Sequence, residues 1–381
     1  MLEICTFPML RPAPCPSDAS TRICLRDVPV RLIWGVAAML KMAILAVTLL
    51  FAELPPAAAW SFTDDGGRIV EIPDRVSRVL AAGPPAAVLI YVSAPDKLVG
   101  WVREPSAREK EFLLPAVQSL PTIGRLTGQG ETANMEAVLA ARPDIIIDVG
   151  TVDDRFVALA DEIQQRTGIP YVLIDGSLAN TPKSLRQVGK LLGVSSRADE
   201  LAAYADRTLK RLDDGLAQIA MAERPRVYYG RGPQGVETGL AGSINLEILE
   251  AVGATNVAAA AGKGGLTRVS PQQIIDWNPQ FILAYAPKFA QAVRVDRLWN
   301  QIAAVKDGNV YVTPTLPFGW FESPPGVNRL IGISWLEALF YPKAFQVDLK
   351  GDVQAFFKLF YQVELTDAQL DGLLKDALPK T

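Results

Sequence analysis

The chain has 381 residues, of which 49% are hydrophobic and 21% are charged, and this composition fits about two globular domains with apolar cores. Its formal net charge is −3. Because no basic run is present to attract phosphates, nucleic acid is excluded as a partner.

An apolar segment near the start of the chain predicts export. Residues 36–52 are nearly all apolar, with Lys41 as their only charge, and prolines and small residues follow. A short cationic region, an apolar stretch and a small-residue peptidase site together form a secretory signal. We therefore expect cleavage after Ala59 and release into the periplasm, so that residues 1–59 comprise an overextended N-terminus plus the signal peptide.

The natural start of the protein would then be Met39 or Met42. The alternative is a membrane anchor that begins near Leu32. Glu53 and two prolines interrupt its apolar run before the ~20 residues that a comfortable span needs, so we favour the cleaved signal.

The mature chain would lack both histidine and cysteine. The sequence contains no histidine, and its three cysteines all precede the signal: Cys5, Cys15 and Cys24. This excludes a Ser-His-Asp triad, a Cys-His dyad, the usual zinc sites and the common haem ligands. Residues 230–235 match the glycine spacing of a dinucleotide fingerprint, but helical periodicity resumes only from Ile244. We therefore expect no cofactor and interpret this segment as a flexible loop beside a ligand.

Short strands and helices alternate in residues 60–180, which predicts an N-terminal α/β lobe. The strand candidates end near Gly, Asp or Pro: Val79–Ala81, Leu98–Gly100, Ile145–Ile147 and Tyr171–Ile174. Asn134 is placed to cap a helix that runs to Arg142 and stops at Pro143. Alternating strands and helices imply a parallel sheet covered on both faces.

Residues 181–223 have helical spacing and contain no strand candidate. Thr181 and Pro182 form a helix start, and Gly193 interrupts the pattern. We predict two linking helices, the longer spanning residues 197–222. Such a helix between two α/β regions would be a rigid connection.

Residues 224–345 predict a C-terminal α/β lobe, and residues 346–381 a helical segment that packs back on a lobe. The second lobe has strand candidates at residues 226–229, 281–285 and 310–313, with helices starting near Ser243 and at Ser270. Ser270 and Gln273 form a capping box, as do Thr366 and Gln369 in the last segment. The predicted fold is therefore α/β, with two doubly wound α/β lobes joined by a long rigid helix and a ligand cleft between the lobes.

Two similarly placed segments resemble a known family. The first is Gly124–Ile147, which contains NMEAV at 134–138 and ARPDII at 141–146; the second is VSPQQI at 269–274 followed by WNPQ at 277–280. Both resemble the lobe signatures of substrate-binding proteins of iron-siderophore and cobalamin ABC importers. The resemblance covers about residues 66–342 and implies a non-enzymatic protein, monomeric by our expectation, that holds a ligand in its cleft with little hinge bending.

The same resemblance implies an acidic residue on each lobe that docks on the importer permease. Glu136 is the first of these by position, although a solvated carboxylate at a helix start is an equal alternative. The second position holds Gln272, so that Asp276 or another nearby acid would have to substitute.

Ligands of open α/β lobes bind beyond the carboxyl ends of the strands, which selects the loops there. The candidate ligand residues in these loops and in the glycine-rich segment before Asn134 are Trp101, Arg103, Arg125, Tyr229, Arg231, Phe318, Trp320 and Glu322. Arginine forks suit the oxygens of carboxylates, catecholates and oxyanions, so we expect an anionic ligand.

A metal chelate is the preferred ligand, because a bare transition metal would require imidazole or thiolate ligands. We therefore predict transport of a ferric siderophore or a related complex, with aromatic residues against its apolar faces. Two alternatives remain: a small oxyanion such as molybdate, or a periplasmic enzyme that uses Glu237, Glu322 or Asp148 as acid and base.

Overall fold

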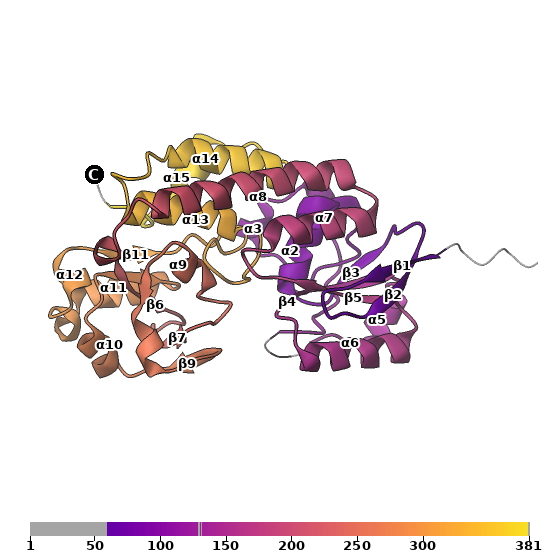
Figure 1. Ribbon diagram of the computed structural model, residues 1–381, viewed down its shortest axis with the longest axis horizontal. Coiled ribbons are helices and arrows are strands. Elements are labelled where there is room, and N and C mark those ends of the chain that lie inside the picture. Colours follow the sequence, from indigo (N-terminus) through magenta and orange to yellow (C-terminus); the bar gives the residue numbers. More distant parts are fainter. Residues whose placement is uncertain (1–58, 129, 131, 380–381) are drawn as a thin grey trace, which may run out of the picture. The chain divides into compact units, whose positions relative to one another are not determined.

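The computed structural model of the protein describes residues 59–128, 130 and 132–379 (Figure 1). The predicted export signal, apart from Ala59, lies outside these residues. The first described element is an antiparallel hairpin of β1 (Ala59–Thr63) and β2 (Ile69–Pro73), which the sequence analysis did not predict. Asp64 stabilises its turn by accepting backbone N–H groups of Gly66 and Arg68.

The first lobe is built around a parallel sheet with the order β3-β4-β5. Its strands β3 (Val79–Ala81), β4 (Ile145–Gly150) and β5 (Tyr171–Asp175) confirm three predicted strands. Helices α2 (Pro84–Ser93) and α7 (Thr181–Leu192) lie on one face, and α5 (Met135–Ala140) and α6 (Asp154–Thr167) on the other (Figure 1). Asn134 caps α5 as predicted.

The predicted strand at residues 98–100 is wrong. Leu98 makes only an isolated parallel bridge to Val79, directly after the short 3₁₀ helix η1 (Pro95–Lys97). The chain then passes through the short helices α3 (Ala107–Lys110) and α4 (Pro115–Gln118) before it returns to the sheet. Because the segment turns away at Trp101 to pair with Thr122, it cannot extend the ladder.

Two consecutive helices connect the lobes. Gly193 adopts a left-handed conformation (φ 67°) and ends α7, and α8 (Ser195–Leu216) follows and runs toward the second lobe (Figure 1). The long helix ends before the predicted residue 222, because the chain turns into η2 (Met221–Glu223). A Cβ on Gly189 would lie 2.2 Å from the Cβ of Ala198, so glycine permits the close packing of α7 on α8.

The second lobe contains a parallel sheet with the order β11-β10-β6-β8. Strands β6 (Arg226–Gly230), β10 (Phe281–Ala284) and β11 (Val310–Val312) confirm the three predicted ones, and β8 (Thr255–Asn256) is a short addition. The helices of this lobe are α9 (Glu247–Ala251), α10 (Pro271–Trp277), α11 (Pro287–Val295) and α12 (Ala303–Lys306), with the 3₁₀ turns η3 (Val257–Ala261) and η4 (Arg297–Trp299). Strands β7 (Glu237–Gly239) and β9 (Leu266–Arg268) form a separate antiparallel ribbon.

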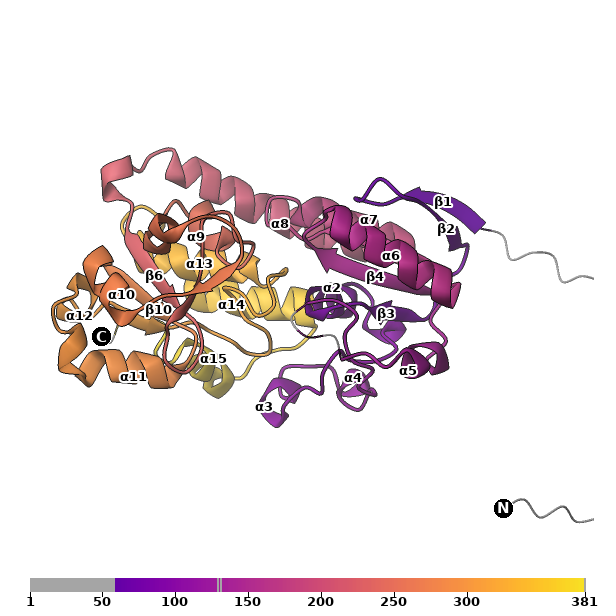
Figure 2. The same cartoon turned by 90° about the horizontal axis from the view of Figure 1, so that it is seen from below.

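The last part of the chain is helical and packs against elements of both lobes; helices were predicted here after residue 345, packing on one lobe. It comprises α13 (Arg329–Phe340), α14 (Leu349–Phe356), the π-helical turn η5 (Phe357–Tyr361) and α15 (Asp367–Leu374). Helix α13 lies against α8 and α14 (Figures 1 and 2), and the hydroxyl of Tyr91 in α2 donates to the carbonyl of Tyr361. Within the described part of the chain, no helix combines the length and apolar character that crossing a membrane requires.

Candidate binding site between the lobes

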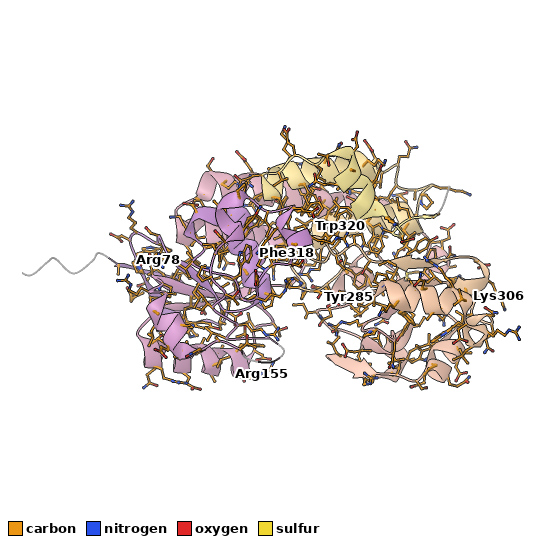
Figure 3. The ribbon with its side chains drawn as sticks, turned by 180° about the vertical axis from the view of Figure 1, so that it is seen from behind. Arg78, Arg155, Tyr285, Lys306, Phe318 and Trp320 are labelled. Carbon is orange, nitrogen blue, oxygen red and sulfur yellow. The ribbon has the colours of Figure 1, made fainter. Side chains whose placement is uncertain are left out.

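A cavity of about 790 Å³ lies between the lobes, beyond the carboxyl ends of strands from both sheets. Six of the eight predicted ligand residues line it: Trp101, Arg103, Arg125, Arg231, Phe318 and Glu322. Figure 3 shows Phe318 and Tyr285 between the two lobes. The ring centroids of Phe318 and Trp101, which come from opposite lobes, lie 6.0 Å apart, so an aromatic contact joins the two walls of the cavity.

The other two predicted ligand residues, Tyr229 and Trp320, are not among the described residues that line the cavity. Trp320 is fully buried, and its indole N–H donates to the carbonyl of Leu316. Tyr229 is also fully buried, stacks on Phe321 and donates its hydroxyl to Glu322. Both aromatic rings therefore belong to the apolar core beneath the cavity, where their polar atoms already have partners.

On the first-lobe side, Arg103 is held by a bidentate ion pair with Glu109. Its two terminal nitrogens lie 2.8 and 2.6 Å from the two carboxylate oxygens of Glu109. Glu109 also accepts the backbone N–H of Ser106 in the capping box of α3. Burial alone would raise the pKa of Glu109, but Arg103 and Ser106 outweigh burial and lower it. The cavity is thus lined here by an ion pair whose positive and negative charges cancel.

Arg125 and Asp148 form the adjacent part of this wall. Arg125 donates through Nε to the carbonyl of Gly130 at 2.6 Å. Asp148, at the end of β4, accepts the hydroxyls of Thr127 and Tyr171, both at 3.0 Å. Burial raises the pKa of Asp148, so this carboxyl is more readily protonated than an exposed aspartate.

The second-lobe wall centres on Arg231, which follows β6 directly. Its Nε donates to Glu322 at 2.8 Å, and its Nη1 donates to Glu237. Burial opposes the charge of Arg231, yet the neighbouring Glu322 raises its pKa above the ordinary value. Glu237 is beside Arg231 because their backbones form an antiparallel bridge. The two glutamates therefore share one arginine, and this salt-bridged arrangement does not resemble an acid and base pair for hydrolysis.

The loop of residues 313–328 carries Glu322 and Phe318 and folds tightly on itself. Peptide bonds Leu316–Pro317 and Ser323–Pro324 are cis. A Cβ on Gly319 would lie 1.7 Å from the carbonyl oxygen of Glu322, so any other residue there would displace the loop. Asn328 completes the loop, because its amide donates to the carbonyl of Phe318 and its side-chain oxygen accepts the hydroxyl of Tyr361.

Sequence reasoning missed several cavity residues, among them Tyr285, Asn245 and Phe156. Tyr285 directly follows β10, so the rule that ligands bind beyond strand ends could have identified it. Asn245 gives no such signal, because it follows an irregular turn after β7 and reaches Glu322 only in the folded chain. Among the described residues, no group of three or more histidine, cysteine, aspartate or glutamate residues is arranged to hold a metal ion.

The predicted docking residues lie on the outer surfaces of the lobes. Glu136 is exposed on α5, where its backbone N–H donates to the side chain of Asn134. Gln272 is exposed on α10 and donates its side-chain amide to Asp276 at 2.8 Å. An acidic side chain is thus present next to Gln272, one helical turn away.

Comparison with known proteins places the chain in context. The sequence profile described as "Periplasmic binding protein" matches residues 99–316, more than half of the chain. The molybdate-binding protein MolA of Haemophilus influenzae is 27% identical over 355 residues, which cover 85% of this chain and 97% of that protein. The high-affinity heme uptake system protein IsdE of Staphylococcus aureus is 21% identical, over 50% of this chain and 67% of its own length.

Among solved structures, an ABC transporter solute-binding protein from Sulfurospirillum deleyianum superposes with a TM-score of 0.75 at 29% identity, covering 83% of this chain and 99% of that one. MolA bound to molybdate superposes with a TM-score of 0.67 at 23% identity, covering 81% and 99%. These matches agree with the α/β architecture and its parallel sheets. They also agree with the resemblance that the paired lobe signatures indicate.

Proposed function

Because the chain belongs to the periplasmic binding protein family, whose members bind a solute for an ABC transporter, we propose that it carries a metal chelate to an importer. Members of this family are non-enzymatic binding components of transport systems. The mature protein would begin after Ala59, act as a monomer in the periplasm and hold the chelate between its lobes. A ferric siderophore is the preferred cargo.

The size of the cavity carries this proposal. Its volume of about 790 Å³ lies within the range of ~300–1,000 Å³ that is typical of sites for organic ligands. A tetrahedral oxyanion would occupy only a small part of this space. Phe156 and Phe318 offer apolar contacts to a chelate, and Arg231 offers donors to its oxygens.

The chemistry of the lining also favours a metal that arrives with its own ligands. The chain contains no histidine, and every cysteine precedes residue 25. Thiolate and imidazole ligands for a bare transition metal are therefore missing from the mature protein. A chelate needs only hydrogen-bond donors and apolar contacts, which this cavity supplies.

Molybdate or a related oxyanion is the second candidate cargo. One specific observation favours it: the relative MolA, whose name records molybdate binding, aligns with this chain over 97% of its own length. Native mass spectrometry of the protein purified from the periplasm of its own cells distinguishes the two cargoes by mass. A co-purifying chelate supports the first proposal, and a co-purifying oxyanion replaces it with the second.

Arg231 provides a mutational test of the site. We expect Arg231→Ala to weaken binding of the co-purified solute at least tenfold in titration calorimetry, because charge-assisted hydrogen bonds are lost. Arg226→Ala is the matched control, since this exposed arginine lies at the opposite end of the same strand. Equal affinities of the Arg231→Ala variant and the wild type would refute the role of this arginine.

We further propose that Glu136 and the Gln272–Asp276 pair contact the permease. Both groups are exposed, and an acidic side chain on each lobe would suit basic residues on a partner. Docking through such ion pairs would weaken at high salt.

A further inference from the structure

Two of the three cavity arginines are already neutralised by the protein. Arg103 pairs with Glu109, and Arg231 pairs with both Glu322 and Glu237. The presence of arginines therefore does not by itself make the cavity attractive to anions. On the second-lobe side, the guanidinium of Arg231 pairs with two carboxylates, of which Glu322 lines the cavity.

Of the two carboxylates that pair with Arg231, Glu322 is the one that lines the cavity. It lines the cavity, yet its side chain is almost completely buried. Its Oε1 accepts the hydroxyl of Tyr229 at 2.7 Å and Nε of Arg231 at 2.8 Å, and its Oε2 accepts the amide of Asn245 at 2.9 Å. Three side chains thus donate hydrogen bonds to this one carboxylate and hold it in place beside Arg231.

The donors of Arg231 are divided between the protein and the cavity. Glu322 engages Nε and Glu237 engages Nη1, whereas neither carboxylate engages Nη2. Arg231 lines the cavity and is held on two sides, so Nη2 is a donor of fixed orientation. The positive charge of Arg231 is already balanced by the protein's own carboxylates. A neutral solute oxygen can therefore accept a hydrogen bond from Nη2, and no negative charge on the solute is needed.

We propose that Glu322 sets the charge selectivity of the cavity: it cancels Arg231, so that the site accepts solutes of little net charge through hydrogen bonds and disfavours compact anions. This inference rests on the proposed function, since it specifies the charge of the solute that the same cavity carries. Among metal chelates, the site would prefer neutral ones whose oxygens accept hydrogen bonds. The expectation of an anionic ligand, drawn from the arginines alone, is thereby revised.

The expected effect of Glu322 on an anion is large. At an effective dielectric constant of ~20, a unit charge roughly 6–7 Å from a bound anion changes its dissociation constant by more than tenfold. Glu322 contacts Arg231 at 2.8 Å, so an anion that binds this arginine would come within that range. Glu237 should have a smaller influence, because its side chain is 36% exposed and solvent screens it.

Glu322→Gln tests the proposal, with Glu237→Gln as the matched control. Glutamine keeps the shape and an acceptor oxygen for Tyr229 and Arg231. The probes are sodium molybdate and a neutral ferric tris-hydroxamate, titrated by calorimetry at low salt and at ~0.3 M salt. We expect Glu322→Gln to bind molybdate at least tenfold more tightly than the wild type, with a smaller gain at high salt, and so to narrow the preference of the site for the neutral chelate over molybdate. Glu237→Gln should gain less than threefold for molybdate.

A measurement on the wild type keeps the proposal testable if the variant does not fold. The wild type should bind the neutral ferric tris-hydroxamate more tightly than a trianionic ferric tris-catecholate. The proposal is overturned if the catecholate binds more tightly, or if a folded Glu322→Gln variant binds molybdate no better than the wild type.

Failure of the proposed function has a different signature. If the wild type binds neither chelate while Glu322→Gln still gains affinity for molybdate, the cargo proposal is wrong and the charge-selectivity proposal stands. If the wild type binds a chelate and Glu322→Gln gains no affinity for molybdate, the cargo proposal stands and the charge-selectivity proposal is wrong. If neither protein binds any probe, both proposals are overturned.

Discussion

Replacing Glu247 with glutamine tests whether a buried ion pair holds the two lobes together. Arg329, the first residue of α13, donates to Glu247 at 2.5 Å and to the carbonyl of Gly176 at 2.6 Å. Glu247, the first residue of α9, also accepts the backbone N–H of Leu178 with both oxygens, each at 3.0 Å. Gly176 and Leu178 follow β5 of the first lobe, so the Arg329–Glu247 pair bridges the first and second lobes.

The expected loss of stability in Glu247→Gln follows from the burial of Arg329 and Glu247. Arg329 is 1% exposed, and burial lowers its pKa despite the neighbouring carboxylate. Removing one partner of a buried pair typically costs ~3–5 kcal/mol, because the other charge is left uncompensated. The Glu247 side chain is 28% exposed and glutamine keeps an acceptor for Leu178, so we expect a loss of about 2 kcal/mol in the free energy of unfolding. At roughly 2 °C per kcal/mol for a chain of this size, the melting temperature should fall by about 4 °C.

Calorimetric melting measures the loss of stability, and spin labels on the two lobes measure their separation. We expect Glu247→Gln to broaden the distribution of distances between labels on α6 and α11 in addition to lowering the melting temperature. Glu250→Gln is the control, because this exposed glutamate lies on the same helix and its carboxylate accepts the backbone N–H of nearby Gly242. A Glu247→Gln protein with wild-type melting and an unchanged distance distribution would show that the pair does not hold the lobes.

Two further predictions concern pH and docking. Burial raises the pKa of Glu337 from 4.5 to about 7, although Arg211 beside it opposes the shift. The folded state therefore binds this proton more tightly than the unfolded state does. As pH rises from about 4.5 to 7, this group should lower the free energy of unfolding by about 3 kcal/mol. Glu337→Gln should remove this slope in melts across that range, and an unchanged slope would exclude Glu337 as its source. Glu136→Lys and Asp276→Lys should each lower solute-dependent ATPase activity of the reconstituted importer severalfold at unchanged solute affinity; wild-type ATPase activity would refute their role in docking.

Much of the fold could be predicted because its elements carry local signals. Six predicted strands are runs of apolar residues bounded by turn residues, and the caps Asn134, Ser270 and Thr366 hold the helices that they predicted. The failures are elements defined by distant contacts. In the segment 98–100, only Leu98 forms a bridge to the sheet, and it pairs with Val79. The β1–β2 hairpin depends on Asp64 and Arg68, which bind backbone and side chains of the first lobe about 100 residues away.

The binding site was predictable to the level of its loops. The rule that ligands bind beyond strand ends selected segments that do line the cavity, including those of Arg103, Arg231 and Phe318. It could not separate residues that face the cavity from those beneath it. Tyr229 lies in β6 and Trp320 in the loop of residues 313–328, both close along the chain to residues that line the cavity, but both rings are buried in the core. Phe318 and Glu322, which do line the cavity, are each two positions from Trp320 along an irregular loop, where no periodicity distinguishes the two orientations.

Charge at the site was the least accessible property, because it depends on pairs rather than on residues. Arg103 and Glu109 are six residues apart, and the Ser106–Glu109 capping box could have indicated where that carboxylate lies. Arg231 and Glu322 are 91 residues apart, and only folding brings them to 2.8 Å. Counting arginines in loops thus overestimates the affinity of a cleft for anions whenever a carboxylate from another loop lies behind the guanidinium. In this protein the distinction decides whether the cavity is suited to a polyanion or to a neutral chelate.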